Sequence, residues 1–140
     1  MVAEHGLVDE MQNAGLMSST AGSLTFTANH AELCKMDRER LSGKAGAQIT
    51  YHLKGHPRAL RIYSFVEQLG GVFDLAWAGN GHSFTKLESN EQSFAGAIDE
   101  PATLLPVLVS VSKIPAAAHD VSIAWRLPAE IGRIEVDFAP

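Results

Sequence analysis

Apolar and polar residues alternate one by one in several short stretches of this chain, and this alternation constrains the fold more than any other feature. The stretches are 23–28, 49–54, 72–78, 83–88, 121–125 and 134–138. Successive side chains of a strand point to opposite faces of a sheet, so each stretch predicts a strand with one buried face. Asn80 and Gly81 separate two of them, and this dipeptide favours the tight type I′ turn of a hairpin. The sequence therefore predicts an antiparallel sheet.

Apolar residues at helical spacing mark other parts of the chain. The first fifteen residues show a loose helical pattern. Asn29 and Glu32 then resemble a capping box, which predicts a helix through about Leu41. Gly43 suits the end of that helix.

Two more helices are expected further along. Pro57 suits a first helical turn, and the apolar residues from Ala59 to Leu69 keep helical spacing until Gly70. The stretch 103–112 is ambiguous, because its alternate valines fit a strand and its wider apolar stripe fits a helix. We predict a helix there, since prolines and charges of the appropriate sign flank the region.

Two strand–helix–strand units thus follow one another between residues 47 and 127, and each ends on a strand that contains a tryptophan, Trp77 or Trp125. The order β-α-β-β-α-β is that of a ferredoxin-like fold. We therefore predict the α+β class, an antiparallel sheet with helices on one face. If 103–112 is instead a strand, the alternative is a strongly curved antiparallel sheet that forms a cone around helices.

At 140 residues the chain has the length of one domain, 1–140. In the predicted arrangement, residues 1–46 add a helix, a strand and a helix. Residues 47–127 form the ferredoxin-like centre, and 128–140 form a C-terminal edge strand.

The net charge and the cysteine content limit which partners and which cellular compartment the protein can have. A net charge of −5 argues against binding of nucleic acid or an anionic membrane. Cys34 is the single cysteine, which excludes an internal disulfide and suits a reducing compartment, so we expect a cytoplasmic protein. His30 would share a helical face with Cys34, and we expect Cys34 to be an inert core residue. The spacing of His, Cys and acidic residues predicts no metal and no cofactor.

Basic residues gather where the strand 49–54 is expected to meet the helix that begins at Pro57. They are His52, Lys54, His56, Arg58 and Arg61. Cations are unfavourable at a helix N-terminus, whereas an anion is favoured there, and Gly55 lets a ligand approach the backbone. Lys54, Gly55, His56 and Arg58 are therefore the predicted binding residues for a carboxylate or phosphate. The alternative is a solvated cluster paired with nearby carboxylates.

A family resemblance rests on the same segment. It is carried by Leu53-Lys54-Gly55-His56-Pro57-Arg58-Ala59-Leu60, followed by Ile62, Phe65, Val66, Leu69 and Gly70. This pattern resembles the first loop and helix of ACT domains, ferredoxin-like regulatory modules that commonly bind amino acids between paired subunits. The resemblance covers 47–88 and, more loosely, 99–127. Where those domains have a glycine after the proline, this chain has Arg58.

Three functions remain open at this point. We favour a regulatory or ligand-binding module that oligomerises and recognises an anionic metabolite or an amino acid. A small enzyme is the second hypothesis, with a cavity lined by Tyr51, Trp77 and Trp125 and a histidine as acid/base. No set of catalytic residues can be recognised in the sequence, however. A structural or adaptor protein that pairs through its edge strands is the third. Trp77 and Trp125 would lie on edge strands, which predicts a homodimer.

Overall fold

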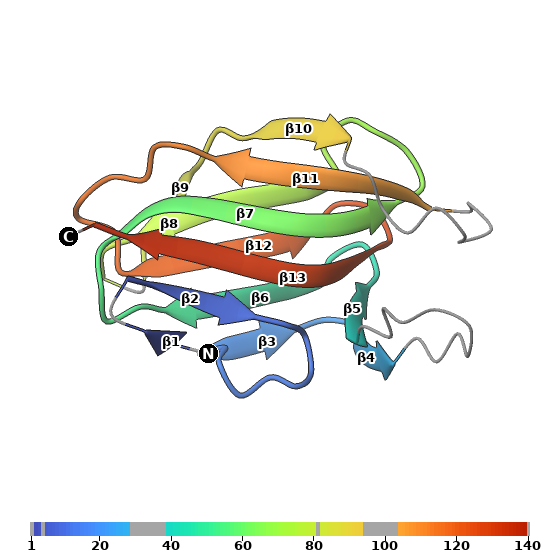
Figure 1. The fold of residues 1–140 in the computed structure, drawn as a ribbon, viewed down its shortest axis with the longest axis horizontal. Coiled ribbons are helices and arrows are strands. Elements are labelled where there is room, and N and C mark those ends of the chain that lie inside the picture. Colours follow the sequence, from blue (N-terminus) through green and yellow to red (C-terminus); the bar gives the residue numbers. More distant parts are fainter. Residues whose placement is uncertain (1, 4, 29–38, 81, 94–103, 140) are drawn as a thin grey trace.

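Two antiparallel sheets lie face to face in the structure, which is a computed structural model (Figure 1). It describes residues 2–3, 5–28, 39–80, 82–93 and 104–139. Strands and their connections make up this described part of the chain, which contains no helix. The fold is therefore a β-sandwich, in which the inner faces of both sheets form one core.

The larger sheet contains eight of the described strands. Six follow one another in the order β1 (Val2–Ala3), β2 (Gly6–Asp9), β13 (Ala129–Phe138), β7 (Pro57–Val66), β11 (Leu105–Val111) and β10 (Asn90–Ser93). β5 (Glu39–Gly43) also pairs with β13, and β4 (Leu24–Ala28) pairs with β5. The first and last parts of the chain are thus neighbours, because β2 and β13 are paired.

The smaller sheet lies behind the larger one in Figure 1. Its described strands follow the order β3 (Ser19–Ala21), β6 (Gln48–His52), β12 (Asp120–Trp125), β8 (Phe73–Ala78) and β9 (Thr85–Lys86).

The core between the sheets is built by the alternation seen in the sequence. Along β7 from Leu60 and along β13 from Arg133, buried side chains alternate with half-buried ones on the outer face. The largest fully buried side chains include Trp125, Tyr51, Met11, Leu41, Ile49, Leu60, Ile62, Ile123, Ile131 and Ile134. Burial of this apolar surface is the main term that stabilises the sandwich.

The α+β, ferredoxin-like prediction is wrong, and β7 shows the physical reason. Residues 57–66 form a ten-residue strand rather than a helix. Leu60, Ile62, Ser64 and Val66 alternate into the core, but Ser64 is polar and interrupts the apolar pattern. Its hydroxyl is satisfied by donating to the Val107 carbonyl at 2.7 Å, a partner that only the folded sheet supplies.

The predicted helix in 103–112 is also wrong within the described residues, where β11 is a strand with Val107, Val109 and Val111 buried. The alternative that treated this segment as a strand was right on that point, but its cone around helices is not observed in the described chain. Nor are the first fifteen residues helical where they are described, since they include β2.

Part of the helix predicted from Asn29 to Leu41 lies at 29–38, outside the described residues, and residues 39–43 form β5. The segment 128–140 does not provide an edge strand, because β13 lies between β2 and β7. The described chain contains no helix of the length and apolar character needed to cross a membrane.

The strands predicted from alternation are confirmed. β4, β6, β8, β9, β12 and β13 lie within or overlap the six alternating stretches. The hairpin at Asn80 exists, since β8 pairs with β9. Gly81, the second residue of the predicted type I′ turn, lies outside the described residues. The Asn80 side chain accepts hydrogen bonds from the backbone N–H groups of His82 and Ser83.

Candidate ligand-binding site

The basic segment does not lie at a helix N-terminus. It connects β6 to β7 beside the last residues of the chain, where Ala139 N donates to the His56 carbonyl at 2.8 Å. Lys54, His56 and Arg58 are exposed, and Gly55 packs against the Phe138 ring, where an added Cβ would approach to 2.7 Å. Gly55 therefore accommodates an aromatic ring of this chain, and the helix-dipole argument for an anion does not apply.

The three aromatic residues expected to line a pocket or an interface lie inside the sandwich. Tyr51 is fully buried, and Trp125 is buried with its indole N–H donating to the Ala129 carbonyl at 3.0 Å. Trp77 is half-buried and packs against the same core. β12, which carries Trp125, is the central strand of the smaller sheet rather than an edge.

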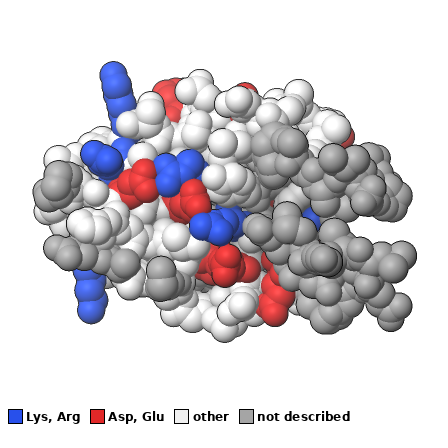
Figure 2. All heavy atoms as spheres, viewed as in Figure 1, with Lys and Arg blue, Asp and Glu red and all other residues white. Residues whose placement is uncertain are grey.

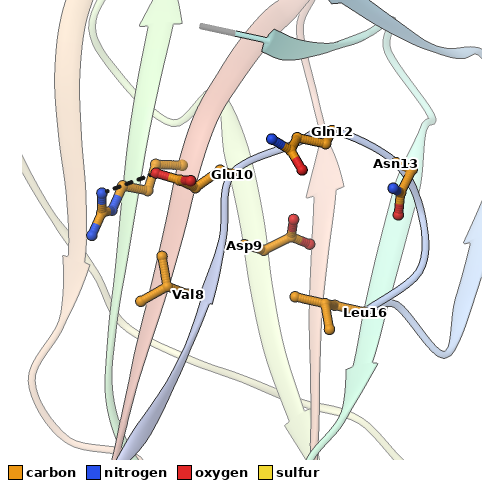
Figure 3. A pocket seen from close by; sticks show the side chains of 7 residues that line it. Val8, Asp9, Glu10, Gln12, Asn13 and Leu16 are labelled. Atoms are coloured by element: carbon orange, nitrogen blue, oxygen red, sulfur yellow. Dashed lines mark hydrogen bonds and ion pairs between the residues drawn. The ribbon is translucent and has the colours of Figure 1, made fainter. Parts of the chain in front are cut away.

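Two neighbouring pockets adjoin β2 of the larger sheet. The first, which we call the loop pocket, has a volume of about 480 Å³. It lies between β2 and the connection to β3, and Figure 3 shows its side chains arranged around an open space. Its lining comprises Val8, Asp9, Glu10, Gln12, Asn13, Leu16 and Arg133. Its volume is in the range of small-molecule sites.

The second, the strand pocket, has a volume of about 240 Å³ and shares Val8 with the loop pocket. It extends over β2, β13 and β7, and Arg61, Glu135 and Asp137 line it together with His5. Every charged member of this lining points outward from a strand whose alternate residues build the core.

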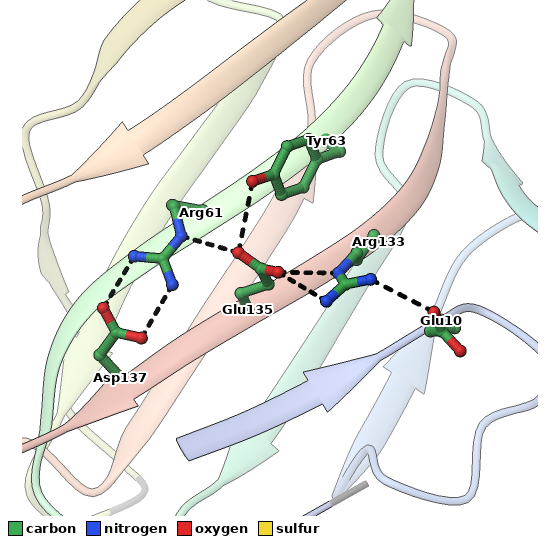
Figure 4. A network of polar contacts seen from close by, with 6 residues as sticks. All are labelled: Glu10, Arg61, Tyr63, Arg133, Glu135 and Asp137. Carbon is green, nitrogen blue, oxygen red and sulfur yellow. Dashed lines mark hydrogen bonds and ion pairs between the residues drawn. The ribbon is translucent and has the colours of Figure 1, made fainter. Parts of the chain in front are cut away.

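A continuous series of ion pairs joins the two pockets (Figure 4). We call it the charged row, and its members are Asp137, Arg61, Glu135, Arg133 and Glu10. Arg61 binds Asp137 with two hydrogen bonds, of 2.7 and 2.8 Å, and donates through Nε to Glu135 at 2.8 Å. Arg133 donates to the other oxygen of Glu135 at 2.8 Å and to Glu10 at 3.3 Å. Tyr63 adds a longer bond to Glu135, at 3.3 Å.

The same row is visible as alternating positive and negative side chains across the face formed by β7, β13 and β2 (Figure 2). It contains two guanidinium groups and three carboxylates. Its charge is therefore nearly balanced, with one net negative charge, and each arginine is shared between two carboxylates.

The ion pairs around Arg61 hold Arg61, Glu135 and Asp137 in the charged form. The Arg61 hydrogen bonds lower the pKa of the Asp137 carboxyl and raise the pKa of Arg61 itself. Burial raises the pKa of Glu135, but the hydrogen bonds and charges of Arg61 and Arg133 outweigh burial, and the pKa lies below its usual value. Arg61, Glu135 and Asp137 are therefore an ordered array of planar, charged groups at neutral pH.

An aromatic side chain lies further along the same face. Phe65 is two residues from Tyr63 on β7, and the Arg40 guanidinium lies 3.6 Å above the centre of its ring. Arg40 also pairs with Glu130 at 3.1 Å. The outer face of the larger sheet thus combines half-buried aromatic rings with fixed polar groups.

Such a surface suits a ligand that carries many hydroxyl groups. Carboxylates accept and guanidinium groups donate hydrogen bonds in a fixed plane, and both retain further capacity after their mutual pairing. The described residues contain no cluster of three or more His, Cys, Asp or Glu arranged to hold a metal ion. Cys34 and His30 lie outside the described residues.

The sequence contained part of this site. Arg133, Glu135 and Asp137 alternate outward on the last strand, which is visible in the residues alone. The pairing of Glu135 and Asp137 with Arg61 does not follow from that pattern, because the sequence places Arg61 in a basic cluster on a predicted helix and Glu135 lies 74 residues away.

No protein-family model matches this sequence, and no curated protein is significantly similar to it. Solved structures do resemble it. CsCBM6-3 from Clostridium stercorarium, in complex with cellobiose, has a TM-score of 0.57 and 12% identity over 95% of this chain and 94% of its own. The C-terminal CBM6 of LamC, a marine laminarinase from Zobellia galactanivorans, has a TM-score of 0.56 and 14% identity over 94% and 98%. The module CBM6cm-2 from Cellvibrio mixtus lichenase 5A, in complex with cellotriose, has a TM-score of 0.52 and 12% identity over 96% and 98%.

These structures belong to family 6 carbohydrate-binding modules. At such low identity the similarity establishes the fold alone. This similarity overturns the resemblance to ACT domains. The segment that resembled their first loop and helix contains the strand β7, and the described part of the chain forms a β-sandwich. The regulatory module for an amino acid or anionic metabolite is overturned with it. The chain has the β-sandwich fold of family 6 carbohydrate-binding modules.

Proposed function

We propose that this protein binds an oligosaccharide on the outer face of its larger sheet, across the loop pocket and the strand pocket. The observation that carries this proposal is the charged row, which joins two adjacent pockets with ordered donors and acceptors. Two solved structures with the same fold hold cellobiose and cellotriose, which supports a sugar as the class of ligand.

The charges of the site favour a neutral sugar. Both arginines of the row are already bound to two carboxylates each, and the row has one net negative charge. A uronate or sulfated sugar would be repelled by the carboxylates and would have to break an existing ion pair. A neutral sugar can add hydrogen bonds to the outer lone pairs and N–H groups without breaking any pair.

The proposed ligand is a small molecule, as the sequence suggested, but of a different chemical class. The homodimer stays a prediction. Its original argument does not hold in this fold, because Trp125 is buried on a central strand.

Isothermal titration with neutral and uronate-containing oligosaccharides tests the proposal. We expect cellobiose or cellotriose to bind and uronate oligosaccharides not to bind. Arg133→Met should weaken binding at least about tenfold, since it removes charge-assisted donors that serve both Glu135 and the loop pocket.

Arg126→Met is the matched control, because Arg126 is exposed and its contact with Asp74 is only a 3.8 Å pair. It should bind the sugar as the wild type does. The proposal fails if no oligosaccharide binds the wild type, or if Arg133→Met binds as tightly as Arg126→Met.

A further inference from the structure

Met11, a residue with a strained backbone conformation, lies at the start of the loop that lines the loop pocket. Met11 has a φ of +59°, and it is the one non-glycine residue in the described chain with a positive φ. Side chains other than glycine rarely adopt this left-handed conformation, and it persists only where the surroundings impose it. The Met11 side chain is fully buried in the core. The loop is therefore tied to the interior at its first turn.

A hydrogen-bonded chain from the opposite sheet holds this turn. The Tyr51 hydroxyl, on β6 of the smaller sheet, donates to Asp9 Oδ2 at 2.8 Å. The second oxygen of Asp9, Oδ1, accepts from the Met11 backbone N–H at 3.1 Å. Asp9 and Tyr51 are both buried, at 4% and 0% exposure. Burial and the Asp9 charge raise the pKa of Tyr51, so its hydroxyl remains a donor at neutral pH.

The far end of the loop is attached to the same strand. Ser18 donates to the Thr50 carbonyl through its backbone N–H at 2.8 Å and through its hydroxyl at 3.0 Å. Thr50 immediately precedes Tyr51, so both ends of the loop are anchored on adjacent residues of β6. Between the anchors, Gln12 and Asn13 present exposed amide groups to the loop pocket.

We propose that Tyr51 is a positioning residue for the loop pocket: acting through Asp9 and Met11, its buried hydroxyl holds the loop 10–17 in the conformation that places Gln12 and Asn13 for the ligand. This inference rests on the proposed function for the identity of the ligand. The loop geometry itself does not depend on it.

The test compares Tyr51→Phe with Ile49→Val. Tyr51→Phe removes only the hydroxyl. Ile49→Val removes one methylene from the core side of the same strand and leaves both hydrogen bonds of Asp9 in place. Hydrogen exchange of the backbone amides of residues 11–16 measures the order of the loop. Titration with cellotriose measures the affinity for a neutral oligosaccharide. Thermal unfolding of both variants measures how much each substitution lowers the stability of the whole protein, which is the effect that a purely structural role would have.

We expect Tyr51→Phe to speed exchange in the loop and to weaken sugar binding, each by about fivefold or more, as loss of one buried hydrogen bond implies. Ile49→Val should change neither, although it lowers the unfolding temperature. Should Tyr51→Phe not fold, Asp9→Ala removes both hydrogen bonds, and faster exchange at 11–16 is then the expected result. Only its exchange is used, because Asp9 itself lines the pocket.

Unchanged exchange in the loop overturns the inference. So does a loosened loop with unchanged affinity, because the loop would then be no part of the ligand site. A wild type that binds no sugar refutes the proposed function instead, and the exchange comparison still decides whether Tyr51 orders the loop.

Discussion

Single side chains on the outer face of the larger sheet illustrate how strand pairing creates a site. Glu135 and Arg61 are direct cross-strand partners, and each also binds a second member of the charged row. Opposite charges at facing positions stabilise a sheet modestly. Because these pairs share members, removing Arg61 takes two hydrogen bonds from Asp137 and one from Glu135, which keeps its bond to Arg133.

The charged row should make the free energy of unfolding depend on pH in the acidic range. Asp137 and Glu135 have lowered pKa values in the folded protein, so their contribution is present above the usual carboxyl pKa of about 4 and is lost as the pH falls through the lowered values. We expect the free energy of unfolding to decrease as the pH falls below about 5. The two carboxyls together should account for about 1 kcal/mol, because solvent screens half-exposed pairs.

Urea unfolding at a series of pH values measures this dependence. Arg61→Gln should flatten it, because the donor that lowers both carboxyl pKa values is lost. Arg126→Gln, at the exposed 3.8 Å pair with Asp74, should leave the slope as in the wild type. An Arg61→Gln protein with an unaltered slope would contradict the assignment.

At the level of elements, β5 shows how closely two parts of the sandwich approach. It pairs with β13, and its last residue, Gly43, lies against the buried Trp125 ring. A Cβ at position 43 would lie 2.5 Å from the indole, closer than any stable contact. The β4–β5 hairpin can therefore reach this position only because the residue is glycine.

Gly43→Ala is expected to destabilise the protein by about 1–3 kcal/mol, the usual cost of overpacking a core. The neighbouring Ser42→Ala is the control, because Ser42 is half-buried on the alternate face of β5. It should change the free energy of unfolding by less than about 0.5 kcal/mol. Denaturant titration distinguishes the two, and equal stabilities would show that Trp125 can move away.

For the whole molecule, β13 joins parts of the chain that are far apart in sequence. It pairs with β2, β5 and β7, and it contributes Ile131, Ile134 and Val136 to the core. The two sheets have one connected core, so loss of this strand exposes apolar surface on several neighbours at once.

A chain that lacks residues 129–140 should therefore show no cooperative thermal transition. Deletion of residues 1–3 is the control. It removes the two-residue strand β1, which among the described strands pairs with β2 alone, and it should leave the transition nearly unchanged. Circular dichroism during heating follows both proteins. A sharp transition in the 129–140 deletion would show that the remaining strands form a sufficient core.

Six of the thirteen described strands followed from the residues themselves. Period-two alternation is a local property, so the stretches at 49–54, 72–78, 121–125 and 134–138 predicted strands that the structure confirms. The outward direction of Arg133, Glu135 and Asp137 followed from the same pattern. Local sequence therefore determined which segments extend and which of their faces is apolar.

The class of fold and the site were decided only by tertiary structure. Residues 57–66 and 105–111 fit the periodicity of a helix as well as that of a strand, and pairing with neighbouring strands decides between them. Ser64 on β7, for example, can be buried without penalty because its hydroxyl donates to the Val107 carbonyl on β11. Likewise, the row forms because β7 and β13 pair in a register that places Arg61 opposite Glu135, 74 residues apart. Contacts over such distances are absent from any local pattern, since they exist only once the sheet has formed.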